Sequence, residues 1–472
     1  MKLDSIITVS WCLTPILCLS VTSVGASSGT TFIAPPTDPP SAPVIEDATA
    51  ASETDVESGE VPVIEVPEIE VPEIEAPPID PEAVDAAIAG GIRLLLARQE
   101  GADQAEWPYQ GVYRVAPRPD DPEALIEGRG RRRTVIPIGY RVGGTSIAGR
   151  ALLRGLEIGE HPDRRAAVER ARRFVIGATS HPLMNPDFGG GYDVRGWGYV
   201  YGLGFLLDLR ARGLVSDEAM QATDDGIRFY VEALGSIEIP EVGGWNYARR
   251  GPLDRVDSTS PFMTPPGVQA LREAARQGFE IPDGIIQRAM AGIEFTRGDD
   301  GHVAYAARRP TREPATQIPG AIGRMLAVST VRSEMGLADD AEVRRACAAF
   351  LVHWGELLKR KGRDGTHQAP YGVAPYYFMY AHGYAAEAIE RLPEVERGLW
   401  RDRLARLLMS VHDGEKAGWN DRVFDRSAAY GTSIAVLALT QSAESSRVHA
   451  VPPPPKPSLD TEESRVIPTE SP

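Results

Sequence analysis

The chain has 472 residues and a hydrophobic share of 42%, which is enough for a large folded core. Its formal net charge is −16, but 13 acidic residues and no Lys or Arg lie in residues 27–80, so residues 81–441 are close to neutral. This distribution argues against a strongly basic nucleic-acid-binding face, and we expect no nucleic-acid partner.

The first 26 residues have the pattern of an export signal peptide. Lys2 precedes a long apolar stretch, and the small residues at 24–26 suit cleavage. Because Pro15 weakens a membrane-spanning helix, we expect a secreted or periplasmic protein, with an uncleaved membrane anchor as the alternative. Cleavage leaves Cys347 as the only cysteine, so no internal disulfide is expected.

Pro-rich segments flank the central part of the chain. Residues 61–80 repeat a five-residue unit, VPEIE, in which proline forbids a helix and the glutamates repel one another. We therefore expect residues 27–80 to form a disordered acidic linker and residues 442–472 a disordered Pro-rich tail.

Residues 81–441 show helical periodicity in pairs of segments. The first member of each pair is amphipathic, as at Ile88, Ile92 and Leu95. The second is apolar almost all round, as in GTSIAGRALL (144–153), which is typical of a helix surrounded by other helices. Six such pairs predict an all-α domain, an α/α toroid of six helical hairpins in two concentric rings. An open solenoid would need polar capping repeats, which the sequence lacks.

Glycine and aromatic residues recur where the amphipathic segments end. Examples are FGGGYDVRGWGYVY (188–201), GGWNYARR (243–250) and KAGWNDRVF (416–424). Glycine permits a tight turn, and we expect the aromatic residue to pack against the neighbouring hairpin. These joints therefore predict a turn from an outer to an inner helix, and a pocket at the end of the ring where the inner helices begin.

The joints and the small-residue helices resemble the prenyltransferase and squalene-cyclase repeat family, whose members are terpenoid cyclase-like α/α toroids. The resemblance rests on GGWNYARR, on GWNDRVFDRSAAYGTSIAVLAL (418–439) and on GGGYDVRGWGYVYGLGFLLDL (189–209). It spans residues 81–441 and implies the toroid fold rather than one activity.

The catalytic motifs of that family are missing from this chain. Class II terpene cyclases carry an Asp-any-Asp-Asp acid, and the nearest stretches here begin instead with Arg118, Ala222 and Arg297. The zinc-binding Asp-Gly-Cys of protein prenyltransferases is absent, because Cys347 has no acid two residues before it. We therefore expect no metal, no cofactor and no classical cyclase or prenyltransferase chemistry, with Cys347 as a buried apolar side chain.

Carboxylates, tyrosines and a histidine gather in the joints and at the heads of the second helices. The candidate pocket residues are Asp193, Tyr199, Asp254, Asp257, His367, Tyr376, Tyr377, Asp421, Asp425 and Tyr430. Such a mixture suits a glycan, which stacks on aromatic rings and bonds to carboxylates, or an isoprenoid, whose double bonds lie against rings. Alternatively, Asp257 and Asp425 cap helices and the tyrosines serve only in packing.

Three functions are compatible with these residues. The favoured one is an exported ligand-binding or interaction module, with an isoprenoid, a glycan or a protein as its partner. The alternatives are a terpene cyclase-like enzyme with an atypical acid and a carbohydrate-active α/α barrel. The sequence leaves open whether the protein is an enzyme.

Overall fold

The computed structural model describes residues 79–113, 115, 126–127, 134–155, 162–187, 194–247, 253–298, 301–306 and 317–442. All of them belong to one compact unit, Glu65–Pro472. The expected signal peptide lies outside the described residues, and so do the linker and the tail apart from residues 79, 80 and 442.

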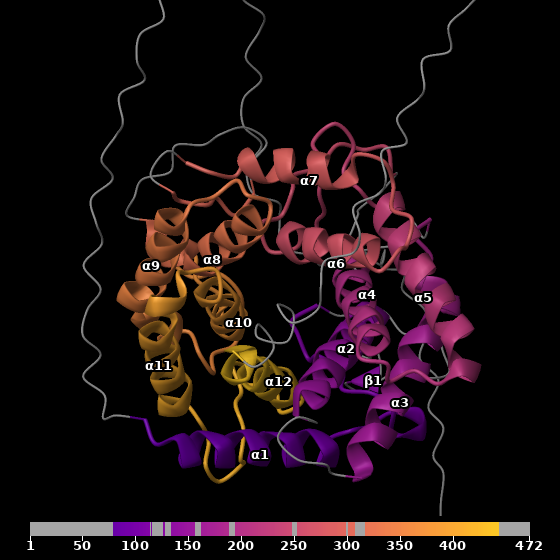
Figure 1. Cartoon of the computed structure of the whole chain (residues 1–472), viewed down its shortest axis with the longest axis horizontal. Helices are drawn as coiled ribbons and strands as arrows, with labels where there is room; N and C mark the ends of the chain where they lie inside the picture. Colours follow the sequence, from indigo (N-terminus) through magenta and orange to yellow (C-terminus); the bar gives the residue numbers. More distant parts are fainter. Residues whose placement is uncertain are drawn as a thin grey trace, which may run out of the picture. The chain divides into compact units, whose positions relative to one another are not determined.

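In this part of the chain, twelve α-helices alternate between an outer and an inner ring (Figure 1). The outer helices are α1 (Pro81–Ala97), α3 (Pro162–Gly177), α5 (Asp217–Ser236), α7 (Ile285–Glu294), α9 (Asp340–Leu358) and α11 (Glu394–Ser410). The inner helices are α2 (Ile138–Gly155), α4 (Arg195–Ala211), α6 (Thr264–Arg276), α8 (Ile318–Glu334), α10 (Tyr377–Ile389) and α12 (Ser427–Leu439). The predicted α/α toroid of six helical hairpins is confirmed.

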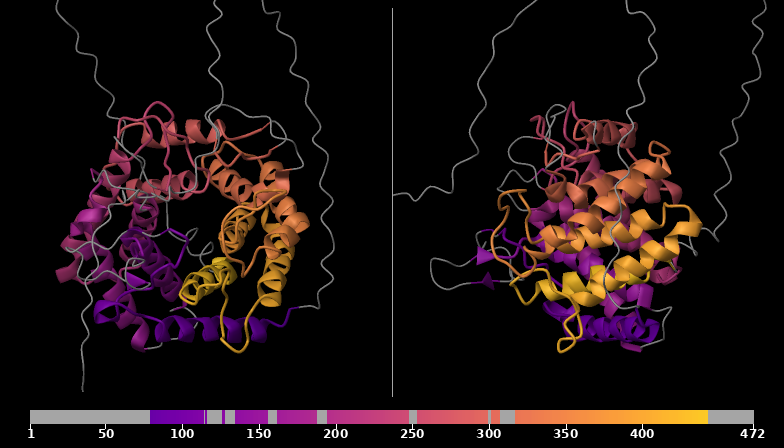
Figure 2. Two further views of the ribbon diagram at one scale, coloured as in Figure 1. Left: turned by 180° about the vertical axis from the view of Figure 1, so that it is seen from behind. Right: turned by 90° about the vertical axis from the view of Figure 1, so that its left-hand side faces the viewer.

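The inner ring is closed. Each inner helix contacts the next one around the ring, and α12 packs against both α10 and α2. At the seam between the last and first hairpins, Arg98 binds Asp425 at 2.7 Å and Arg426 binds Glu100 at 2.6 Å. Figures 1 and 2 show the inner helices surrounding a central axis and the outer helices surrounding them.

The two rings differ in burial as their sequences predict. In outer helix α5, one face is buried and carries Ile227, Tyr230 and Leu234, while the acidic residues of its first turn are exposed. In inner helix α8, every residue from Pro319 to Val331 is buried. Because α8 has neighbours on most sides, its segment lacks an amphipathic pattern.

Three tryptophans anchor the turns from outer to inner helices with the same pair of hydrogen bonds. The anchors are Trp107, Trp245 and Trp419. Each indole Nε1–H donates, at 2.7 to 2.8 Å, to a carbonyl oxygen in the last turn of the preceding outer helix, in Leu95, Leu234 and Leu408. Each backbone N–H donates, at 2.9 to 3.0 Å, to a threonine Oγ1 of the following inner helix, in Thr145, Thr264 and Thr432.

These hydrogen bonds lie within one hairpin, and the ring of Trp419 also lies against Gly91 of α1, in the neighbouring hairpin, as expected. The hydrogen bonds have a physical reason, since the last carbonyl groups of a helix lack partners inside that helix. The indole N–H satisfies one such carbonyl group of its own outer helix.

The sequence GTSIA occurs at the head of both α2 and α12, at 144–148 and 431–435. A Cβ atom on Gly144 or Gly431 would lie 2.3 or 2.6 Å from the carbonyl oxygen of the preceding tryptophan. Glycine therefore allows the joint to approach the inner helix, and the following threonine bonds the tryptophan. The repeated motif thus has a structural cause.

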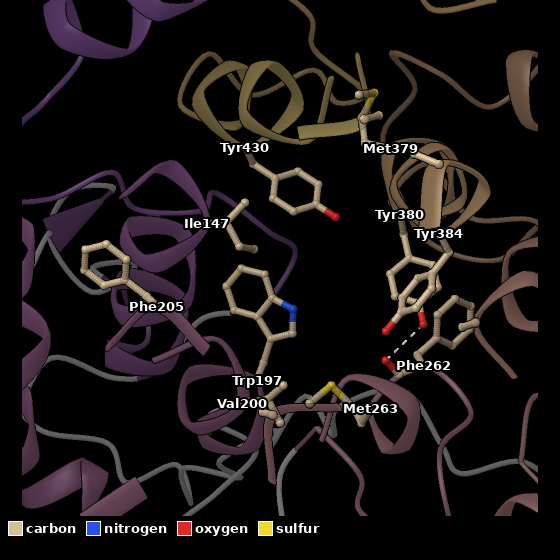
Figure 3. Packing of buried hydrophobic residues seen from close by; sticks show 14 of the residues in the cluster. Ile147, Trp197, Val200, Phe205, Phe262, Met263, Met379, Tyr380, Tyr384 and Tyr430 are labelled. Atoms are coloured by element: carbon tan, nitrogen blue, oxygen red, sulfur yellow. Dashed lines mark hydrogen bonds between the residues drawn. The ribbon is translucent and has the colours of Figure 1, made fainter. Parts of the chain in front are cut away.

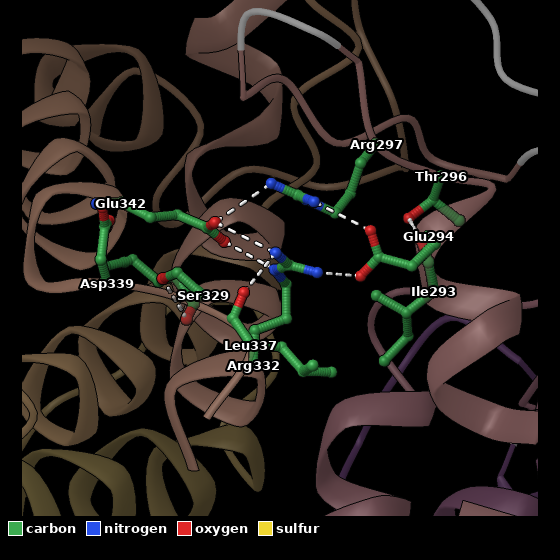
Figure 4. A network of polar contacts seen from close by, with 10 residues as sticks. Ile293, Glu294, Thr296, Arg297, Ser329, Arg332, Leu337, Asp339 and Glu342 are labelled. Carbon is green, nitrogen blue, oxygen red and sulfur yellow. Dashed lines mark hydrogen bonds and ion pairs between the residues drawn. The ribbon is translucent and has the colours of Figure 1, made fainter. Parts of the chain in front are cut away.

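An ion-pair network joins α7, α8 and α9 (Figure 4). Arg332 of α8 binds Glu342 of α9 at 2.9 Å, and it also binds Glu294 of α7. Arg297 binds the same two carboxylates, at 2.8 Å to Glu294 and 3.1 Å to Glu342. Two guanidinium groups shared between two carboxylates hold these three helices together more firmly than an isolated surface pair would.

Elements other than α-helices are short. The described parts of the connections contain three 3-10 helices, η1 (Ala102–Gln104), η3 (Ala178–Ser180) and η4 (Pro182–Met184). Strands β1 (Ile126–Glu127) and β2 (Thr134–Val135) pair in antiparallel fashion. Among the described residues, no helix combines the length and the apolar character needed to span a membrane.

Candidate functional site

A narrow pocket lies at the end of the toroid where the inner helices begin, and we call it the aromatic chamber. It is lined by Tyr109, Gly111, Val112, Tyr113, Tyr140, Trp197, Tyr247, Phe262, Tyr376, Tyr380 and Tyr430. The ring centroids of Tyr109 and Tyr430 are 4.8 Å apart, and those of Tyr109 and Trp197 are 5.5 Å apart. Because its free volume is about 60 Å³, the chamber is too small for a whole ligand of ordinary size.

A larger space follows along the axis, between the C-terminal halves of the inner helices, and we call it the wide cavity. Its volume is about 790 Å³, which is in the usual range for a small-molecule site. Tyr380 and Tyr430 line both the aromatic chamber and the wide cavity. The two spaces therefore meet at these rings, and together they form the lumen of the toroid.

Two hydrogen-bond donors point into the lumen without a protein partner. Figure 3 shows the indole nitrogen of Trp197 and the hydroxyl of Tyr430 directed into the central space, across from Tyr380 and Tyr384. Trp197 is 8% exposed and Tyr430 is 7% exposed, yet neither donor bonds to another group in the described part of the chain. Because both groups face the lumen and no described protein acceptor uses them, they are available to a ligand.

One wall of the wide cavity carries a network of polar side chains centred on Gln269 of α6. Its Nε2 donates to Glu387 Oε2 at 2.9 Å and to Glu334 Oε1 at 3.1 Å, and the Tyr384 hydroxyl donates to its Oε1 at 3.1 Å. Glu334 also forms ion pairs with Arg272 at 3.1 Å and Arg391 at 3.0 Å. Burial raises the pKa of Glu387, and the neighbouring Glu334 raises it further.

The facing wall, on α2 and α4, holds an ion pair between Arg150 and Asp208 at 2.7 Å. Burial tends to raise the pKa of Asp208, but the guanidinium groups of Arg150 and Arg154 lower it overall. The carboxylate of Asp208 is therefore kept in its charged form.

Two adjacent charged residues, Asp421 and Arg422, are buried beside the aromatic chamber. Asp421 is fully buried, and its two carboxylate oxygens have no hydrogen-bond partner among the described residues. Burial raises the pKa of Asp421 to about 7, against the lowering effect of the adjacent Arg422. The Arg422 guanidinium lies over the rings of Tyr376 and Phe424, 5.6 and 5.3 Å from their centroids.

The structure places the predicted pocket residues in different environments. Tyr376 and Tyr430 line the aromatic chamber. Tyr377 is buried beside it and stacks on Phe262 at 4.6 Å. His367 is exposed, with Nε2 2.7 Å from the Tyr377 hydroxyl.

Tyr199, Asp254 and Asp257 are not among the described residues that line the lumen. The Tyr199 hydroxyl donates to the Met184 carbonyl oxygen at 2.5 Å and its ring packs against α5, so this tyrosine has a packing role. Asp193 lies outside the described residues, and Asp254 is exposed. Asp257 is half-buried and accepts a hydrogen bond from the Ser258 N–H at 2.7 Å.

The structure does not bring Asp257 and Asp425 together. Asp425 lies in a separate pocket at the seam of α1 and α12, where Arg98 binds it, and the described lining of that pocket does not include Asp257. Neither residue caps a helix, since α6 begins at Thr264 and α12 at Ser427.

Several lumen residues were missed from the sequence, namely Tyr109, Tyr140, Trp197, Tyr380, Tyr384 and Glu387. A positional signal was present. Four of the six inner helices carry an aromatic residue at their third or fourth position, as Tyr140, Trp197, Tyr380 and Tyr430. One helical turn later, Tyr201 and Tyr384 continue the same face into the wide cavity.

Cys347 is buried in α9, as expected for an apolar side chain. Burial raises the pKa of its thiol to about 12, so the thiolate required by a metal ion is disfavoured. Within the described ranges, no group of three His, Cys, Asp or Glu side chains is arranged to hold a metal ion.

Comparison with known proteins supports the architecture. No protein-family model matches the chain, and no curated protein matches it. The structure is similar to that of an unsaturated glucuronyl hydrolase from Streptococcus agalactiae, with a TM-score of 0.50 and 12% identity over 80% of this chain and 98% of that one. A GH76A alpha-1,6-mannanase from Salegentibacter sp. HEL1_6 gives a TM-score of 0.46 and 10% identity over 77% of this chain and 99% of that one. The first likeness shows the α/α toroid fold alone, and the second is too weak to add to it.

Proposed function

We propose that this chain is an exported α/α toroid that binds a saccharide in its lumen. The observation that carries the proposal is the pair of unpartnered donors, Trp197 Nε1–H and the Tyr430 hydroxyl, within walls made of aromatic rings. A sugar offers apolar faces that stack on such rings and hydroxyl oxygens that accept from such donors. The wide cavity, at about 790 Å³, has the room for it.

An isoprenoid fits these walls less well. Its hydrocarbon chain would displace water from the two donors and offer no acceptor in return. Each donor left unsatisfied would cost roughly 1 to 3 kcal/mol. A saccharide ligand is also in keeping with the carbohydrate-processing names of the solved structures that share the fold, although the proposal does not rest on them.

Binding rather than hydrolysis is proposed because no pair of free carboxylates faces the lumen among the described residues. Glycoside hydrolysis usually needs an acid and a second carboxylate on either side of the bond. Here Asp208 is held by Arg150, and Glu334 is held by two arginines. Glu387 alone lacks a cationic partner.

The test is a screen of the purified chain over an oligosaccharide array, followed by calorimetric titration of the saccharides that bind. Tyr430→Phe should weaken binding about fivefold, the loss of one hydrogen bond, with unchanged thermal stability because the hydroxyl has no protein partner.

Tyr199→Phe is the matched control. It removes a hydroxyl that bonds inside the protein, so it should lower stability by about 1 kcal/mol and leave saccharide affinity unchanged. Absence of saccharide binding, or equal affinities of Tyr430→Phe and the parent protein, would contradict the proposal.

A further inference from the structure

We propose that the wide cavity contains a subsite for an ammonium group, formed by the Glu387 carboxylate and the rings of Tyr201, Tyr380, Tyr384 and Tyr430. The inference deepens the proposed function, because Tyr380 and Tyr430 also belong to the aromatic chamber. It assigns to the ligand a positively charged group.

Glu387 differs from the other carboxylates that line the wide cavity. Asp208 is paired with Arg150, Glu273 with Arg276, and Glu334 with Arg272 and Arg391. Glu387 accepts only the 2.9 Å hydrogen bond from Gln269, and no ion pair reaches it in the described part of the chain. A carboxylate in such a site is strongly destabilised without a cation, and a ligand ammonium would supply one.

The tyrosines surround this carboxylate. Tyr201 and Tyr384 line the wide cavity together with Glu387, and the Tyr384 hydroxyl and the Glu387 carboxylate bond the same side chain, Gln269, at 3.1 and 2.9 Å. The ring centroids of Tyr380 and Tyr384 are 4.9 Å apart, and their planes are inclined by 50°. Inclined aromatic rings beside a carboxylate attract an ammonium ion through both the ring faces and the charge.

The described arginines of the wide cavity do not form ion pairs with Glu387. Arg150 faces Glu387 across the cavity and is held by Asp208 at 2.7 Å, while Arg391 and Arg272 are held by Glu334. Their charges are thus opposed by nearer carboxylates. The Tyr430 hydroxyl, buried and unpartnered, adds a polar atom that points toward the same space.

Calorimetric titration of the full chain with tetramethylammonium chloride tests the subsite without a sugar. The neutral control is tert-butanol, which has a similar size. Tetramethylammonium should bind at least about tenfold more tightly than tert-butanol, and Glu387→Gln should remove that difference while keeping the side-chain shape.

Glu273→Gln is the matched variant, since Glu273 lines the same cavity but has its own partner in Arg276. It should leave tetramethylammonium affinity within about twofold of the parent value. Tyr384→Leu, which removes one ring, should weaken tetramethylammonium binding whether or not Glu387→Gln folds.

Equal binding of the cation and the alcohol, or full affinity in Glu387→Gln, would overturn the inference. If the chain binds saccharides but not tetramethylammonium, the subsite is wrong and the proposed function stands. If the chain binds tetramethylammonium but no saccharide, the subsite stands and the proposed function is wrong. Chitosan oligomers, with free amines, compared with their N-acetylated forms then distinguish an amino sugar from another source of ammonium.

Discussion

Trp245 in a joint and Trp197 at the head of α4 are both buried tryptophans, but they differ in the hydrogen bonding of their indole N–H groups. Trp245 is fully buried, and both its indole and its backbone N–H groups donate to protein atoms, at 2.8 and 3.0 Å. Trp197 is nearly as buried, but its indole N–H meets no described protein acceptor. Burial alone therefore does not distinguish a structural tryptophan from one that can bind a ligand. The distinction is whether the indole N–H already donates to a protein acceptor.

The comparison extends to the tyrosines. Tyr199 and Tyr201 are two residues apart on α4, and the first packs outward against α5 while the second lines the wide cavity. In a helix, a step of two residues turns the side chain by about 200°, so Tyr199 and Tyr201 point in nearly opposite directions. Stability should depend on the outward-facing set and ligand binding on the lumen-facing set.

The largest expected effect is on the joint. Trp245→Ala should lower the free energy of unfolding by about 3 to 5 kcal/mol, because a large buried ring and its indole hydrogen bond to the Leu234 carbonyl oxygen are lost. Chemical denaturation of the variant and the parent protein measures this. A variant that unfolds at the parent midpoint would show that the joint does not anchor the hairpin.

A smaller effect concerns Asp421, a polar group buried beside the lumen. Its pKa is raised from 3.8 to about 7 in the folded protein, so the folded state holds a proton that the unfolded state releases above about pH 4. Stability from this group is present below pH 4 and is lost as the pH rises through 7, by about 2 kcal/mol between pH 5 and pH 7.

Asp421→Asn should remove this dependence. The free energy of unfolding of the parent protein, measured at pH 5 and pH 7, should fall more than that of the variant over the same interval. Identical pH slopes would mean that Asp421 is already ionised at pH 5.

The sequence predicted the fold of this protein better than it predicted the residues of the candidate binding site. The alternation of one-sided and all-round apolar helices, and the Gly-Trp joints, were enough to predict an α/α toroid, while its closure is seen only in the structure. The lumen-facing residues were harder to choose because an inner helix is apolar on every side, so its pattern does not reveal which face looks to the axis. Tyr199 was selected and Tyr384 was missed for this reason.

Charged residues were misplaced for a different reason. Asp257 and Asp425 stand close to the heads of inner helices in sequence, but a local hydrogen bond holds the first and a distant arginine, Arg98, holds the second. Glu387 lies near the end of α10, where no motif marks it. Which charged residues pair across the seam depends on how the ring closes, and their separation along the sequence does not reveal this.

The smallest effect is expected at Asp257. Because its carboxylate bonds only to the following serine and lies outside both described cavity linings, Asp257→Asn should change the free energy of unfolding by less than about 0.5 kcal/mol. Saccharide affinity should also be unchanged, as measured by calorimetric titration. A marked loss of affinity would place Asp257 at the ligand and extend the site beyond the lumen.

The most direct measurement is hydrogen exchange at the tryptophan indole groups, followed in ¹⁵N–¹H spectra and assigned with single Trp→Phe variants. The Nε1–H groups of Trp107, Trp245 and Trp419 should exchange slowly, since each donates to a helix carbonyl. The Trp197 Nε1–H should exchange faster in the free protein and should slow and shift when a saccharide binds. A Trp197 indole as protected as that of Trp245 in the free protein would contradict the account, because its donor would then already be satisfied.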